Sequence, residues 1–361
     1  MRDLIVFTSY KQSKPNNSAE IVQCLDNFKR VIWVNLDYTQ RSGKHVFPKH
    51  QCPALLHAGR GENIYLNIAG VPVTDTQIKR QRAKQIILDA LMPILYAHQI
   101  SRPVLWTSER IVADVLDQFD RASLVYLCDK EETFHNTQHA HIAFLQQQLL
   151  VNCSDVVFAA NENLCAQFPA KKTFLLQQGV DLKLFCTPAP KAVDLPNNGK
   201  PTAGFYADLD THIDFRLLFL TALSRPDWNF AVLGANKLPH YPLPRLNNVY
   251  YLGPKQHRLL PSYSQHWQAS ILPLASTGCY SAAAQQTLLE YLAVGAPIIT
   301  TDRYNIGRFS KYVNLVQSAH EMSEALQAAV YEPKRSADLV FSDSWQVRSR
   351  FVDSVLQVIP R

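Results

Sequence analysis

The chain has 361 residues, of which 47% are hydrophobic and 18% are charged, with 17 Phe, 15 Tyr and 5 Trp. This length predicts two domains of ordinary size, and the composition excludes intrinsic disorder. Only 12 residues are glycine, about half the usual share, which argues against a collagen-like chain and a tandem dinucleotide-binding dehydrogenase. The net charge of +6 is mild, so we expect no nucleic-acid partner.

In the first half, short β-branched and aromatic runs alternate with segments of helical length. Strands are predicted at residues 4–9, 30–36, 63–68, 103–107, 123–128, 155–160 and 172–177. Helices are predicted at residues 18–28, 76–99, 109–118, 136–152 and 161–168. Near-continuous apolar strands that alternate with helices indicate buried parallel strands and therefore an α/β fold.

A proline-rich segment, 186–201, interrupts this pattern and is typical of a linker. Strands then follow at residues 202–206, 229–233, 248–252, 270–274, 297–301 and 312–316. Helices follow at residues 213–223, 258–266, 284–294, 319–331 and 343–358. We expect two Rossmann-like domains, residues 1–185 and 195–342, with a ligand-binding crevice between the carboxyl ends of their parallel sheets.

The cysteines and the start of the chain bear on its compartment. Seven widely spaced cysteines without a Cys-x-x-Cys pair fit neither a disulfide framework nor a zinc site, and predict a reducing compartment. The first apolar run is too short for a signal peptide, and no stretch approaches the ~18 apolar residues of a spanning helix. We therefore expect a cytoplasmic protein that can lie on the inner face of the cytoplasmic membrane.

The most informative segment is 270–302, a strand, a loop of small residues and a helix. Gly295 follows this helix, where a missing Cβ suits a left-handed C-cap, and amides at the helix start favour an anion. Glu290 stands among leucines, where a carboxylate is costly unless donors reach it, such as the two hydroxyls of a ribose. The alternative is a solvated glutamate, and spacing alone does not decide between them.

The string TLLEYLAVGAPIITTD, residues 287–302, resembles the donor-site motif of GT-B glycosyltransferases of the family-4 kind. Residues 155–161, 179–185, 214–234 and 248–263 resemble other elements of that family. The likeness is nearest to bacterial teichuronic-acid and surface-polysaccharide enzymes, whose Tyr-Asp-Cys-Met-Asp-Asp element is similar to YLCDKEETF at 126–134. It implies a GT-B fold, two Rossmann-like domains facing each other across a cleft. The acceptor domain comes first, the donor-binding domain second, and residues 343–361 cross back to the first.

The resemblance also implies an activity. A hexose would pass, with retention, from a nucleoside-diphosphate sugar (UDP or GDP) to a hydroxyl of a lipid-linked or growing surface glycan. No metal or other cofactor is expected. Two departures leave alternatives open: Ala282 stands where the family has a first glutamate, and the loop 207–214 lacks its usual basic residue. The chain could instead be a non-catalytic GT-B nucleotide-binding subunit, or a GT-B sugar-nucleotide epimerase.

Further donor-side candidates follow from this resemblance, and each could equally be a surface residue. His212 is the one candidate in its loop to face a pyrophosphate, helped by the N-terminus of the helix that follows. Lys255 comes after a Gly-Pro turn near the expected position of the base. The remaining donor-side candidates are Asp210, Ser281 and Thr287.

In the N-terminal domain, the polar loop 9–20 is interpreted as acceptor-binding, through Ser9, Tyr10 and Lys11. Asp129 follows a strand, so it could act as a general base on an acceptor hydroxyl or merely cap the next helix.

Helix 76–99 carries four basic residues ahead of an apolar half. Such a helix can lie on anionic lipid, or pack into the core with its basic end solvated. Both readings stay open at this point.

Overall fold

The computed structural model describes residues 2–9, 17–38, 61–73, 76–129, 138–275, 282–301 and 306–358. The chain divides into two compact units. The first comprises Met1–Gln178 with Trp345–Arg361, and the second comprises Gly179–Ser344.

The first unit is built on a seven-stranded sheet of order β3-β2-β1-β4-β5-β6-β7, in which all neighbours are parallel. Its strands are β1 (Arg2–Thr8), β2 (Phe28–Asp37), β3 (Glu62–Ala69), β4 (Val104–Thr107), β5 (Ser123–Cys128), β6 (Val156–Ala159) and β7 (Thr173–Leu175). The strand order reverses between β1 and β4, and such a switch point is where open α/β sheets bind ligands.

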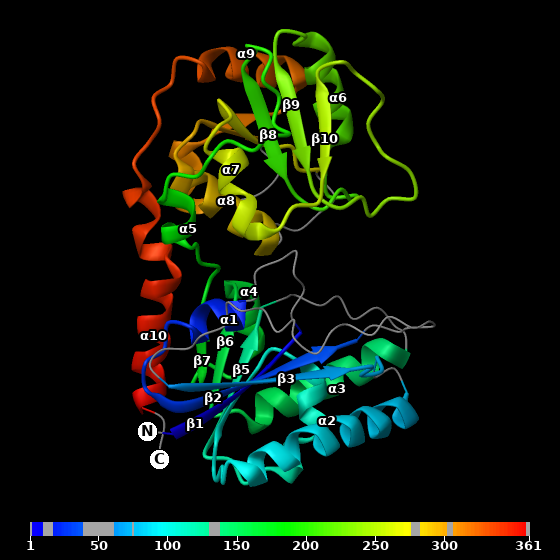
Figure 1. Cartoon of the computed structure of the whole chain (residues 1–361), viewed down its shortest axis with the longest axis vertical. Coiled ribbons are helices and arrows are strands. Elements are labelled where there is room, and N and C mark those ends of the chain that lie inside the picture. The colour runs from blue at the N-terminus through cyan, green and yellow to red at the C-terminus, as the bar shows by residue number, and fades with distance from the viewer. Residues whose placement is uncertain are drawn as a thin grey trace. The chain divides into compact units, whose positions relative to one another are not determined.

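Helices cover both faces of this sheet (Figure 1). Its α-helices are α1 (Asn17–Val22), α2 (Gln77–Ala97), α3 (Gln138–Cys153), α4 (Glu162–Gln167) and α10 (Trp345–Val358). The segment 109–118, predicted as one helix, forms the 3₁₀ helices η1 (Arg110–Asp114) and η2 (Leu116–Gln118) instead. Its residues at 111, 112, 113, 115 and 116 are all buried, whereas an amphipathic α-helix buries one face.

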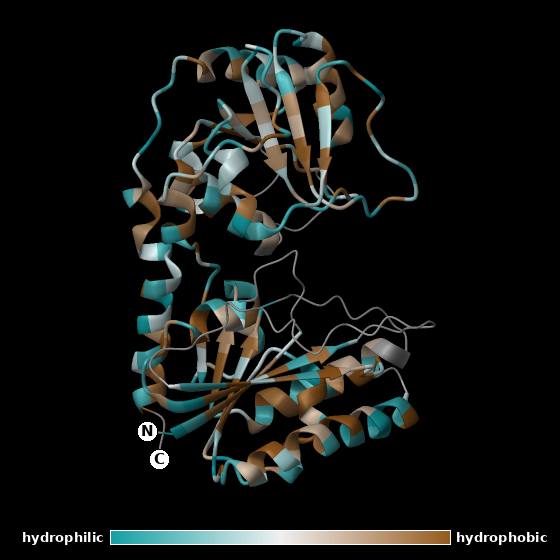
Figure 2. Cartoon of the chain, in the orientation of Figure 1, coloured by the Kyte–Doolittle hydropathy of each residue, from teal (hydrophilic) through white to brown (hydrophobic). Residues whose placement is uncertain are grey.

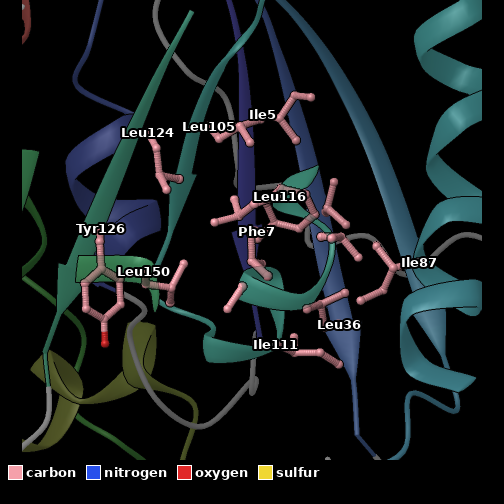
Figure 3. Close-up of a cluster of buried hydrophobic side chains, with 14 of the residues drawn as sticks. Ile5, Phe7, Leu36, Ile87, Leu105, Ile111, Leu116, Leu124, Tyr126 and Leu150 are labelled. Carbon is pink, nitrogen blue, oxygen red and sulfur yellow. The ribbon is translucent and has the colours of Figure 1, made fainter. Parts of the chain in front are cut away.

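Successive side chains of a strand point to opposite faces of the sheet, so the first unit has two separate hydrophobic cores. Ile5 and Phe7 on β1 pack with Ile87 of α2 (Figure 3). Val6, which lies between them on the strand, packs in the cluster that contains Trp345 of α10. Because both faces are covered, the strands are hydrophobic along most of their length (Figure 2).

The second unit repeats this plan with a six-stranded parallel sheet of order β10-β9-β8-β11-β12-β13. Its strands are β8 (Thr202–Tyr206), β9 (Asn229–Leu233), β10 (Val249–Gly253), β11 (Ala269–Leu272), β12 (Ile298–Thr301) and β13 (Asn314–Val316). The strand order reverses between β8 and β11. The α-helices among the described residues of this unit are α5 (Leu182–Cys186), α6 (Phe215–Ser224), α7 (Pro261–Ser264), α8 (Ala282–Val294) and α9 (Ala319–Ala329).

The described part of the second unit also contains the 3₁₀ helices η3 (His257–Leu259), η4 (Gly307–Tyr312) and η5 (Ala337–Asp343). The predicted helix 258–266 is split into η3 and α7 at Pro261, which has no backbone N–H and starts α7. Gly295 adopts φ +81° after α8, so the predicted left-handed C-cap is confirmed. The predicted linker contributes buried Leu195 to the core of this unit.

Among the described residues, no helix is long and apolar enough to cross a membrane.

Candidate functional site

A buried carboxylate lies near the switch point of the second sheet. Glu290, on α8, is only 3% exposed. Its Oε2 accepts a hydrogen bond from the hydroxyl of Tyr206, the last residue of β8, at 2.7 Å. Its Oε1 lies 2.7 Å from Nε2 of His257, whose side chain is 18% exposed. The reading of Glu290 as a solvated helix residue is therefore wrong.

The donors that Glu290 requires come from the protein itself, so its burial does not by itself demand a ribose. Among the three residues, His257 is the most accessible to an incoming molecule. Its ring meets the edge of Phe185 at a centroid distance of 5.5 Å, which limits how it can turn. The carboxylate of Glu290 is thus held on its buried side by Tyr206, and on its more accessible side it contacts the imidazole of His257.

Electrostatics keep the tyrosine in its donating form. Burial, together with the negative charge of Glu290, raises the pKa of Tyr206 well above 10. Tyr206 therefore stays protonated and donates to the carboxylate at any physiological pH. Its backbone N–H donates to the hydroxyl of Tyr291 at 3.1 Å, and its ring stacks on Trp267 at 6.1 Å. These contacts fix the inner side of the site.

Lys255 is held by another partner. Its Nζ donates to Asp194 at 2.6 Å and lies 5.5 Å from the ring centre of Tyr263. Burial alone would raise the pKa of Asp194, but hydrogen bonds from Lys255 and Tyr263 outweigh it and leave that pKa below the usual value. The lysine thus anchors residue 194, within the predicted linker, to the second unit.

The other donor-side candidates lie around the ends of β8 and β11. His212 is exposed, its N–H donates to Asp210 at 2.9 Å, and its carbonyl accepts from the N–H of Ala275 at 2.8 Å. The loops that follow the two strands are therefore joined. Thr287 is half-buried, one helical turn before the carboxylate on α8. Ser281 lies outside the described residues.

The helix after His212 has a side-chain cap at its N-terminus. Asp214 caps α6 by accepting the N–H of Leu217 at 2.8 Å. A capping carboxylate already lies at the positive end of this helix, and the help expected from its N-terminus toward a pyrophosphate stays a prediction.

The first unit has its own polar group at the switch point. Ser9 donates to Oε1 of Glu109 at 2.7 Å, and Tyr38 donates to Oε2 of the same carboxylate at 2.9 Å. Sequence reasoning missed Glu109, although a carboxylate two residues after a buried strand was the available signal. Tyr10 and Lys11 lie outside the described residues.

Asp129 is described, at the end of β5, next to β4 in the sheet. Its Oδ2 accepts a 3.5 Å contact from Nδ2 of Asn17, the first residue of α1. Ser18, the second residue of that helix, accepts a hydrogen bond from the indole of Trp106 at 2.9 Å. The general-base role of Asp129 stays a prediction.

Helix α2 packs into the core along a stripe of Ala83, Ile87, Leu91 and Leu95. Of its four basic residues, Arg80 pairs with Asp114, and Lys84 pairs with Asp117 at 2.8 Å. These two basic side chains are thus paired within the unit. Contact with anionic lipid stays a prediction.

Across the described ranges, no group of three or more His, Cys, Asp or Glu side chains could hold a metal ion.

A curated protein is similar to part of this chain in sequence. No family model matches the chain. Over 178 residues, this chain is 24% identical to the Bacillus subtilis protein described as "Putative teichuronic acid biosynthesis glycosyltransferase TuaH". The aligned part spans 48% of this chain and 45% of that protein, so it covers less than half the length of the relative.

Solved structures match along nearly the whole chain. HepE of Anabaena, solved with UDP and glucose, has a TM-score of 0.66 at 10% identity, covering 98% of this chain and 99% of that one. An Escherichia coli trehalose-6-phosphate protein bound to UDP-2-fluoro glucose has a TM-score of 0.67 at 12% identity, covering 99% and 100%. At such identities the likeness concerns the fold. The chain therefore has the GT-B fold, and its resemblance to GT-B glycosyltransferases is confirmed.

Proposed function

We propose that this chain is a glycosyltransferase that takes a hexose from a UDP-sugar and transfers it to a hydroxyl of a surface glycan. The observation that carries the proposal is the buried Glu290, paired with His257 beside the switch point of the second sheet. The structural neighbours solved with UDP and glucose or with UDP-2-fluoro glucose support UDP as the nucleotide. The teichuronic-acid relative supports a glycan acceptor.

In this proposal the ribose binds at the Glu290–His257 pair. A carboxylate oxygen can accept two hydrogen bonds, so each oxygen of Glu290 keeps capacity beyond its contact with Tyr206 or His257. The inner hydroxyl of Tyr206 holds the carboxylate in place while His257, the outer partner, adjusts to the diol. A fixed carboxylate costs little reorganisation when it receives charge-assisted hydrogen bonds.

The diphosphate would then lie along the joined loops that carry His212 and Ala275. A nucleoside-diphosphate leaving group needs its developing charge stabilised, which backbone amides and a nearby imidazole can do without a bound metal. We further propose transfer with retention to a lipid-linked acceptor, with α2 approaching the membrane.

A two-stage experiment tests the proposal. Thermal shift with UDP, GDP and their sugars identifies the nucleotide, and release of free nucleotide is then measured with glycan acceptors. Stabilisation by UDP-sugars and acceptor-dependent release of UDP are expected. Binding without release on any acceptor would favour a non-catalytic subunit, and a changed sugar without acceptor would favour an epimerase. No stabilisation by any nucleotide would refute the proposal.

A further inference from the structure

Three residues from three strand ends meet at the switch point of the first sheet. Ser9 follows β1, Tyr38 follows β2, and Glu109 comes two residues after β4. These strands are adjacent in the order β2-β1-β4, and all run parallel. Because the carboxyl ends of parallel strands share one edge, residues distant in sequence are brought together there. All three side chains are half-buried, which leaves them partly accessible.

The carboxylate of Glu109 is fixed from several directions. Ser9 donates to one oxygen at 2.7 Å and Tyr38 to the other at 2.9 Å. The backbone is held as well, because Oγ1 of Thr107 accepts the N–H of Glu109 at 2.8 Å and donates to its carbonyl at 3.1 Å. Both the main chain and the side chain of Glu109 are therefore set before any ligand arrives, which lowers the cost of binding.

The surroundings keep the hydroxyl of Tyr38 as a hydrogen-bond donor to the carboxylate. Burial, followed by the charge of Glu109, raises the pKa of Tyr38 well above 10, so its hydroxyl remains a donor. The positive charge of Arg110 acts on Tyr38 in the opposite direction without reversing this shift. The carboxylate of Glu109 already accepts two hydrogen bonds, and each oxygen can still accept another.

We infer that Glu109, held by Ser9 and Tyr38, is a binding residue for the hydroxyls of a neutral sugar at the switch point of the first sheet. A carboxylate with spare acceptor capacity takes hydroxyl donors and repels phosphates and uronates. Under the proposed function this sugar is the acceptor, so the inference rests on that function for its role. The binding site itself can be tested without turnover.

The test measures binding of methyl glucoside, methyl glucuronate and glucose 6-phosphate to the full chain by saturation-transfer NMR titration. The wild type is expected to bind the neutral glycoside about tenfold or more tightly than either anion. Glu109→Gln keeps the shape of the side chain and removes its charge, and should weaken the neutral glycoside about tenfold. Ser9→Ala, which removes one anchor, should weaken it less. Asp89→Asn, an exposed acid-to-amide change on α2, is the matched control and should leave binding unchanged.

Binding of UDP is measured on the same variants, because it concerns the second unit. If Glu109→Gln retains the wild-type affinity for UDP and loses the neutral glycoside, the inference holds. If the wild type binds no neutral glycoside, or Glu109→Gln binds it as well as the wild type does, the inference is overturned. Failure of the wild type to bind UDP would instead count against the proposed function and leave the sugar site standing.

Discussion

Replacing Tyr206 with phenylalanine isolates the inner hydrogen bond of the buried carboxylate. The change removes one hydroxyl, which donates to Oε2 of Glu290 at 2.7 Å. Glu290 is 3% exposed, so water cannot easily replace the lost donor. Hydrogen bonds to charged groups contribute about 1.5–3 kcal/mol. We therefore expect Tyr206→Phe to lower the free energy of unfolding by about 2 kcal/mol, which corresponds to a fall in Tm of roughly 4–8 °C for a unit of this size.

The measurement is urea unfolding followed by tryptophan fluorescence, with Trp228 and Trp267 reporting on the second unit. Tyr250→Phe is the matched control, because its hydroxyl makes only a long, exposed contact with Asn198 at 3.4 Å. That variant should stay within about 0.5 kcal/mol of the wild type. A change for Tyr206→Phe no larger than that of Tyr250→Phe would refute the view that the tyrosine stabilises the carboxylate.

Two further predictions concern the second unit. Gly295→Ala and Gly199→Ala impose the same left-handed strain, since φ is +81° and +80°, but only the Cβ at 295 would meet the carbonyl oxygen of Arg335, at 2.2 Å. Urea unfolding should show a loss of about 1–2 kcal/mol at 199 and a clearly larger one at 295; equal losses would exclude the clash. Burial raises the pKa of Asp194, but its hydrogen bonds, chiefly the one from Lys255, lower it further, so the net pKa is below the usual value. This predicts a contribution to stability that is present above about pH 4 and is lost as pH falls through the folded pKa. Asp194→Asn should be destabilising at pH 7 and approach the wild type below pH 4, and a difference independent of pH would contradict the pairing.

The parallel strands could be predicted because a strand that is buried on both faces consists of a nearly continuous run of apolar residues. The predicted strands 202–206 and 229–233 have the bounds of β8 and β9. Helices were harder where burial is not confined to one face, as at 109–118, or where a proline starts a new turn, as at Pro261.

The contacts of the site are less visible in the sequence. Glu290 stands out as a carboxylate among leucines, but its partners lie 84 and 33 residues away and come together only through the sheet order. Glu109 gives a still weaker signal, because its partners Ser9 and Tyr38 lie 100 and 71 residues away. A local pattern indicates that a buried charge needs donors, and the topology decides which residues supply them.

The most direct test of the account is calorimetric titration of UDP into the wild type and Glu290→Gln. Gln keeps the shape and helix propensity of the side chain but removes the charge that strengthens hydrogen bonds from a ribose. Affinity should fall roughly 10- to 100-fold, because such bonds contribute about 1.5–3 kcal/mol and ~1.4 kcal/mol is tenfold. Glu324→Gln, at an exposed position on α9, should bind UDP like the wild type. Equal affinity of Glu290→Gln and wild type, or no UDP binding by the wild type, would contradict a nucleotide site at Glu290.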